Sequence, residues 1–212
     1  MYETVSYGCL VIDIPRSRMT PERQAELFDV VIDLVREVGY EGLTLDAVAA
    51  RAKTSKATLY RQWQGKPGLV VAALQCHKPH VEPPPPAASL AEDLELLARD
   101  AENHDDAGQD VKLTYGLMHA AATDEAFGAA VRETFLEPAL AGIADIFSRA
   151  SARGEIADDP QLFRELATSL ASRYLFALHF GGDTGIVEGG RRHMDLIIKP
   201  LLGLKPTFTE QL

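Results

Sequence analysis

The chain has 212 residues, which suits one large domain or a small domain joined to a bigger one. With 46% hydrophobic and 25% charged residues it has an ordinary globular composition, and its net charge of -10 excludes nonspecific coating of nucleic acid. The presence of only two cysteines fits a reducing cytoplasm. No apolar run approaches the roughly 18 residues that a membrane span needs. The first residues lack the positively charged start of a signal peptide. We therefore expect a cytoplasmic protein without a membrane partner.

Residues 1–18 show no helical period and contain Gly8 and Pro15, which predicts a flexible N-terminal arm. Arg16 and Arg18 stand just before the first helix signal. A leader without a role is the simpler interpretation of this arm, and a basic arm that reaches DNA is the alternative.

The next segment contains the signals of three helices. A first helix is predicted from Thr20, which can cap it, to Gly39, which can end it in a left-handed conformation. Between these two residues, apolar side chains recur at the spacing of one helix face. Two shorter helices follow, capped by Thr44 and Ser55 and joined by a tight turn at residues 53–54.

A fourth helix begins near Lys66 and leads to the Pro-rich residues 78–86, where four consecutive prolines predict a stiff linker. Helical patterns then continue over residues 89–101, 111–122, 124–154, 160–180 and 187–203. Pro138 is expected to kink the third of these. No segment has the period of a strand, so the predicted class is all-α, with about nine helices.

One stretch of the chain has an unusual charge. From Ala47 to Val81 it contains six basic residues and no Asp or Glu. The rest of the chain contains the other 15 of the 21 basic residues and all 31 acidic residues. A basic island in an acidic chain indicates a local surface for a polyanion. The two short helices overlap this island with the spacing of a helix-turn-helix, whose second helix lies in the major groove of DNA.

The side chains needed for such a contact are present. Helix N-termini offer N–H groups to phosphates, and hydroxyl, guanidinium, ammonium and indole groups supply further donors. The candidate donors are Thr44, Ser55, Lys56, Thr58, Tyr60, Arg61, Trp63 and Lys66. The apolar residues assigned to the core are Leu45, Val48, Ala49 and Leu59.

Residues 20–75 resemble the N-terminal domain of the TetR family of transcriptional repressors. The motifs that carry the resemblance are Gly39-Tyr40-Glu41-Gly42-Leu43-Thr44, Val48-Ala49-Ala50-Arg51-Ala52, Ser55-Lys56-Ala57-Thr58-Leu59-Tyr60-Arg61-Gln62-Trp63 and Gly65-Lys66. The rest of the chain is similar to the family in its length, its helical content and the turn at residues 154–156.

The resemblance implies a homodimer that binds a palindromic operator in double-stranded DNA and is released by a small-molecule effector. By residue match, the phosphate contacts fall on Thr44, Tyr60 and Lys66. The base contacts fall on Lys56, Ala57, Thr58 and Arg61. Trp63 is expected to pack and also to touch phosphate. No cofactor is implied.

Two departures from the family pattern lie in the turns. Lys53-Thr54 stands where the family prefers Gly-Val, so Lys53 is expected in a left-handed conformation that costs a non-Gly residue roughly 1 kcal/mol. Residues 65–68 replace the usual start of the fourth helix with Gly-Lys-Pro-Gly, which leaves Lys66 without neighbouring acids.

The resemblance divides the chain into an arm (1–18), a helix-turn-helix domain (19–66), a connecting helix with the Pro-rich linker (67–86), and a helical ligand-binding and dimerisation domain (87–212). Dimerisation is expected through the apolar last two helices. Candidate residues for a largely apolar effector, with core packing as the alternative for each, are Tyr115, Met118, His119, Phe135, Phe147, Tyr174 and Leu178.

Three other functions were weighed. A zinc site at His77 and His80 lacks a third ligand nearby, and Pro79 breaks the helix between them. An enzyme is not expected, because the paired acids occupy loop or capping positions. A DNA-binding protein whose C-terminal domain serves a protein partner, instead of an inducer, stays open as the alternative function.

Overall fold

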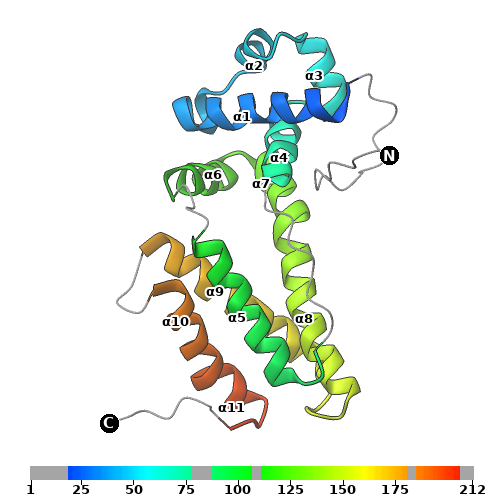
Figure 1. Cartoon of the computed structure of the whole chain (residues 1–212), viewed down its shortest axis with the longest axis vertical. Helices are drawn as coiled ribbons and strands as arrows, with labels where there is room; N and C mark the ends of the chain where they lie inside the picture. Colours follow the sequence, from blue (N-terminus) through cyan, green and yellow to red (C-terminus); the bar gives the residue numbers. More distant parts are fainter. Residues whose placement is uncertain (1–18, 78–86, 107–110, 181–184, 206–212) are drawn as a thin grey trace, which may run out of the picture. The chain divides into compact units, whose positions relative to one another are not determined.

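The computed structural model describes residues 19–77, 87–106, 111–180 and 185–205 (Figure 1). Within these ranges every regular element is a helix, which confirms the predicted all-α class. Counted with the continuous runs 125–152 and 185–201 as one helix each, the described residues form nine helices, the number expected. The predicted arm at 1–18 and linker at 78–86 lie outside the described residues.

The chain divides into two compact units, which are described separately. The N-terminal unit contains residues 1–82 and 112–134, and the C-terminal unit contains residues 83–111 and 135–212. Residues 112–134, expected in the large C-terminal domain, are joined by their contacts to the N-terminal unit. The contact between α4 (Lys66–His77) and α7 (Glu125–Val131) is the reason, because it brings a segment from the middle of the chain against the first four helices.

The first helix, α1 (Pro21–Gly42), starts as predicted. The Thr20 hydroxyl caps it by accepting the N–H of Arg23 at 3.3 Å. The expected end at Gly39 is corrected: Gly39 does leave the helical conformation (φ 73°), but one more turn follows it before Leu43. Burial of Tyr40, 3% exposed, stabilises this last turn against the rest of the unit.

The short helices α2 (Leu45–Arg51) and α3 (Lys56–Trp63) form the helix-turn-helix, with the predicted caps Thr44 and Ser55. α4 packs against α1, α3 and α7. The core between them contains fully buried apolar residues, and the rings of Phe28 and Trp63 meet edge to face with centroids 5.6 Å apart. The remaining helix of this unit is α6 (Val111–Thr123).

In the C-terminal unit, four helices pack in a ring. α5 (Leu90–Asp106) contacts α8 (Glu137–Ala152), α8 contacts α9 (Pro160–Phe180), α9 contacts α10 (Gly185–His193), and α10 returns to α5. The rings of Phe147 and Phe163 stack at the centre, 5.9 Å apart, and both side chains are buried. No helix within the described ranges has the length and apolar character to cross a membrane.

Two π-helical turns interrupt the long helices. The first, η1 (Arg132–Leu136), directly precedes Pro138, the residue expected to kink the helix, which lies in the first turn of α8. A wider turn before proline accommodates the missing backbone N–H and the ring of that residue. The second, η2 (Met194–Ile198), joins α10 to α11 (Lys199–Leu201), so the last helix covers 185–201 and not the predicted 187–203.

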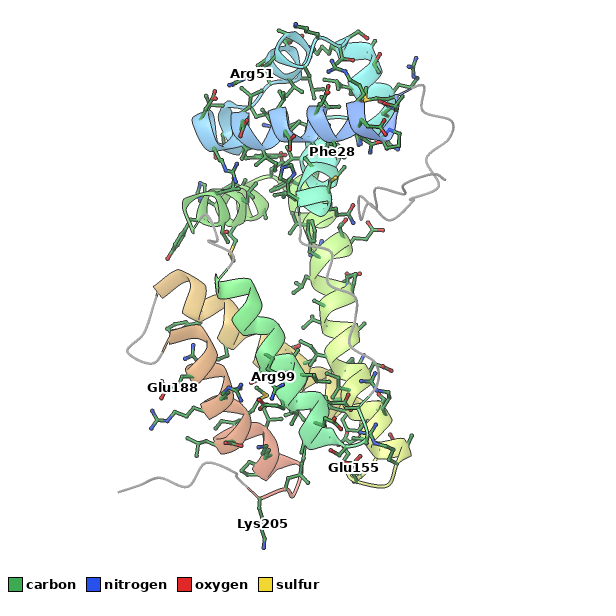
Figure 2. All side chains as sticks on the ribbon, viewed as in Figure 1. Phe28, Arg51, Arg99, Glu155, Glu188 and Lys205 are labelled. Carbon is green, nitrogen blue, oxygen red and sulfur yellow. The ribbon has the colours of Figure 1, made fainter. Side chains whose placement is uncertain are left out.

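A buried carboxylate fixes the start of α5. Asp93 is 5% exposed and accepts hydrogen bonds from Arg149 and Arg153, each at 3.1 Å. Glu155 accepts the first free N–H of the helix, that of Leu90, at 2.8 Å (Figure 2). These contacts hold the beginning of α5 against the end of α8.

Candidate nucleic-acid interface

The helix-turn-helix presents one polar face of α3 to solvent. Leu59 and Trp63 point into the core, 0% and 8% exposed, while Tyr60 on the opposite side is 61% exposed and Arg61 is also exposed. This division follows from the helical period of 3.6 residues, which places apolar and polar side chains of so short a helix on different faces. A hydroxyl and a guanidinium therefore stand free of the core along the later part of α3.

The beginning of α3 is organised by its cap. The Ser55 hydroxyl accepts the N–H of Thr58 at 3.0 Å, and the two hydroxyl oxygens lie 2.8 Å apart. Lys56 and Ala57 are exposed beside them. Thr58, expected to contact a base, is half-buried and shares its hydroxyl with Ser55.

Lys56 has an ionic partner in the protein. Its ammonium donates to Asp46 of α2 at 2.8 Å, with side chains 58% and 72% exposed. Exposed pairs of this kind contribute only about 0–1 kcal/mol. The pair can therefore open for a phosphate or a base at little cost.

Two arginines brace α2. Arg51 donates to both carboxylate oxygens of Glu37 in α1, at 2.6 and 2.7 Å (Figure 2). Arg23, at the start of α1, donates to the main-chain oxygen of Ala52 at the end of α2. Because α2 is thus tied to α1 at its C-terminal end, its N-terminus with the exposed Thr44 cap keeps a fixed position.

The turns on either side of α3 need special backbone conformations. Lys53 has φ 49°, which confirms the left-handed conformation expected for it. At the other end, Gln64 and Gly65 have φ 59° and 131°. Gly68 lies so close to α3 that an added Cβ would be 2.2 Å from the carbonyl oxygen of Trp63. Only glycine fits there, a requirement that the sequence analysis missed.

The residues expected from the family match to contact phosphate differ in how exposed they are. Thr44 and Tyr60 are exposed. Lys66 is half-buried: its ammonium donates to the carbonyl oxygen of Tyr40 at 3.1 Å and lies 4.2 Å from the centroid of that ring. The indole N–H of Trp63 is buried without a partner in the part of the chain that the structure describes, so Trp63 packs, and a phosphate would need a local shift to reach it.

Five of the seven candidate effector residues have described side chains, and these five are divided between the two units. Tyr115, Met118 and His119 are exposed on α6 in the N-terminal unit. Phe135 is half-buried, and Phe147 is part of the core of the C-terminal unit. The side chains of Tyr174 and Leu178 are outside the described residues.

The C-terminal unit carries two open clefts. One, of about 290 Å³, lies between α5 and the last helices, beside the ion pairs of Glu95 with Arg191 and of Asp195 with Lys199. The other, of about 230 Å³, lies between α9 and α10 beside Arg173 and Arg192. None of the described candidate effector residues lines either cleft.

The histidine that suggested a metal site has other partners. His77 lies with Nδ1 3.1 Å from the carbonyl oxygen of Ala73 and Nε2 3.0 Å from Asp29. His80 is outside the described residues. Among those that are described, no three His, Cys, Asp or Glu side chains are grouped as metal ligands would be.

Two protein-family models match the chain. The model described as "Bacterial regulatory proteins, tetR family" matches residues 27–73. The model described as "Tetracyclin repressor-like, C-terminal domain" matches residues 84–184. The first contains the whole helix-turn-helix.

Mycobacterial proteins are similar over much of the chain. The HTH-type transcriptional regulator Rv1556 of Mycobacterium tuberculosis is 36% identical over 138 residues, which is 63% of this chain and 65% of the relative, slightly less than two thirds of its length. The DNA-binding transcriptional repressor TetR of Mycobacteroides abscessus is 31% identical over 160 residues, 72% of this chain and 82% of the relative.

Solved structures of low sequence identity share the fold. GusR of Salmonella enterica has a TM-score of 0.57 at 17% identity, covering 82% of this chain and 91% of its own. A TetR-family regulator of Mesorhizobium loti has a TM-score of 0.56 at 21% identity, covering 83% and 93%. The likeness therefore extends over both the helix-turn-helix and the helical C-terminal part.

Proposed function

Because the chain belongs to the TetR family of transcriptional regulators, we propose that it is a repressor that binds a palindromic operator as a homodimer. The main support for the proposal is the outer face of α3, which presents exposed hydrogen-bond donors to solvent while the other face of the helix is buried in the core. A protein that acts on chromosomal DNA would work in the cytoplasm.

The proposed contacts follow the helix-turn-helix geometry, in which the second helix enters the major groove. Bases would be contacted by Lys56, Ala57, Thr58 and Arg61. Phosphates would be contacted by Thr44, Ser55, Tyr60, Trp63 and Lys66. In this assignment Arg61 carries most of the base selection, because a guanidinium can bind a guanine edge with two hydrogen bonds.

The proposed dimer uses the last two helices of the C-terminal unit. Leu196, Ile197 and Leu201 are 53%, 45% and 58% exposed on η2 and α11, and Phe176 is 58% exposed on α9. Large apolar side chains exposed on η2, α11 and α9 support burial against a second copy. Leu196→Glu should yield monomers by light scattering, whereas Val38→Glu, at a residue 52% exposed in the N-terminal unit, should leave the dimer intact.

A small, largely apolar effector remains part of the proposal. The second candidate is a protein partner for the C-terminal unit. The small volume of the two clefts supports a protein partner over a small molecule. At about 230 and 290 Å³ they fall below the roughly 300–1,000 Å³ of ordinary ligand pockets, and both are open. A thermal-shift screen of small molecules separates the two, since only the effector hypothesis expects a ligand that both stabilises the protein and releases DNA.

Gel-shift assays on the DNA upstream of the protein's own gene test the main proposal. Arg61→Ala should weaken binding by about 1–3 kcal/mol and relax the sequence preference at one position. Tyr60→Phe should weaken binding to all sequences alike, because it removes a phosphate donor. Arg99→Ala, at an exposed arginine of the C-terminal unit, is the control. If Arg61→Ala and Tyr60→Phe both bind like the wild type, the contact assignment is wrong.

A further inference from the structure

Tyr40 links three elements of the N-terminal unit. It lies in the last turn of α1, and its ring stacks on Phe127 of α7 with centroids 4.1 Å apart and planes at 26°. Its hydroxyl donates to Asp124, the residue that caps α7, at 2.9 Å. Burial and the carboxylate together raise the pKa of Tyr40, so the phenol keeps its proton and continues to donate.

Lys66 is held at the same place. Its ammonium donates to the Tyr40 carbonyl oxygen at 3.1 Å and lies 4.2 Å from the ring centroid. A ring at this distance attracts a cation electrostatically. The charge of Lys66 also helps to lower the pKa of Asp124, after the N–H of Phe127, the hydroxyl of Tyr40 and the N–H of Ala126. The carbonyl oxygen and ring of Tyr40 thus contact the ammonium, and the carboxylate that accepts the Tyr40 hydroxyl adds a longer-range attraction.

The Asp124 carboxylate does more than cap α7. One oxygen, Oδ1, accepts the N–H of Phe127 at 3.0 Å, which is the capping bond. The other, Oδ2, accepts the Tyr40 hydroxyl. Asparagine caps a helix about as well as aspartate does, so neither the second oxygen nor the negative charge is needed for the cap.

We propose that Asp124 and Tyr40 form a clasp that retains the Lys66 ammonium on the protein and competes for it with operator phosphate. Asp124 is then a positioning residue that sets operator affinity from α7, outside the helix-turn-helix. The clasp rests on the proposed function, because it requires that Lys66 bind phosphate. To do so the ammonium must leave the Tyr40 carbonyl oxygen, and the clasp opposes that movement.

Asp124→Asn isolates the charge. The amide oxygen can still cap α7, and the amide NH2, in the place of the second oxygen, can donate to the Tyr40 hydroxyl oxygen, but the attraction of a full negative charge for Lys66 is lost. Operator affinity should rise, on the order of fivefold at low salt. The slope of log K against log salt should steepen by up to about 0.9, one additional phosphate contact. Glu125→Gln is the matched control, because it removes an exposed charge from the same helix turn without touching the clasp.

A double-mutant cycle with Lys66→Ala decides the outcome. Loss of Lys66 should reduce affinity more in the Asp124→Asn background than in the wild type, because only the released ammonium contacts phosphate fully. Additive effects, or an equal slope change in Glu125→Gln, overturn the clasp. Asp124→Ser, which retains a capping oxygen and removes the charge, should act in the same direction if Asp124→Asn does not fold. A wild type that binds no DNA would instead overturn the proposed function.

Discussion

Arg51 and Glu37 form a two-pronged ion pair, at 2.6 and 2.7 Å, that joins α2 to α1. The hydrogen bonds from Arg51 lower the pKa of the Glu37 carboxyl, and the carboxylate in turn raises the pKa of Arg51. The pair has the geometry that a planar guanidinium favours over an ammonium.

Arg51→Lys should lower the thermal midpoint slightly at neutral pH, because one of the two parallel hydrogen bonds is lost. The pKa of Glu37 is lowered on folding, so its contribution is present above the ordinary glutamate value of 4.5 and is lost as the pH falls through the folded value. Melting curves of both proteins should therefore converge as the pH is lowered through this range. A difference that persists or grows in acid would contradict the assignment of the pair.

Asp93 should be among the costliest acidic residues to replace. The Asp93 carboxylate accepts hydrogen bonds from Arg149 and Arg153, each at 3.1 Å, in a part-buried site. Asp93→Asn removes the negative charge that these two arginines share. We expect a loss of about 2 kcal/mol in the free energy of unfolding, reduced from the usual figure for a buried pair because both arginines are partly exposed. Urea denaturation measures this loss.

Asp145→Asn is the control for Asp93. This carboxylate also pairs with Arg149, but it is 61% exposed, so its replacement should cost no more than about 0.5 kcal/mol. Equal losses for the two variants would show that burial of Asp93 is not what stabilises the start of α5.

Local signals predicted much of the N-terminal unit. The caps Thr20, Thr44 and Ser55 and the left-handed Lys53 are confirmed, because each depends on a few adjacent residues. The position of the Lys66 ammonium could not be predicted in the same way. It depends on Tyr40, whose hydroxyl is bound by the carboxylate of Asp124, 84 residues after Tyr40 in the sequence, and no local pattern encodes that contact.

Other differences have the same origin. The π-helical turns at 132–136 and 194–198 are each a single wide turn within a long helical run, and no local residue pattern marks them, so the sequence predicts plain helices there. The position of residues 112–134 in the N-terminal unit depends on packing against α4. Phe147 was a candidate effector residue because aromatic side chains suit both pockets and cores, and its burial against Phe163 is a matter of tertiary packing.

Lys53 should combine a cost in stability with a gain in DNA affinity. Lys53→Gly relieves the left-handed strain and should stabilise the protein by about 0.5–1 kcal/mol, while the lost charge weakens DNA binding. Lys53→Ala keeps the strain and loses the same charge. It should therefore match the glycine variant in DNA affinity and the wild type in stability. If the two variants are equally stable, the turn is not strained.

Gly68 should tolerate no side chain, because a Cβ there would lie 2.2 Å from the carbonyl oxygen of Trp63. Gly68→Ala must push α4 away from the end of α3, and we expect a loss of about 1–3 kcal/mol. Gly142 is the matched control. It lies within α8 with no atom inside 4 Å of an added Cβ, so Gly142→Ala should stabilise the protein by up to about 1 kcal/mol.

Since α3 carries the proposed base contacts, Gly68→Ala should also weaken operator binding, whereas Gly142→Ala should leave it unchanged. Loss of stability without loss of DNA binding in Gly68→Ala would show that the spacing of α3 and α4 does not set the position of the recognition helix.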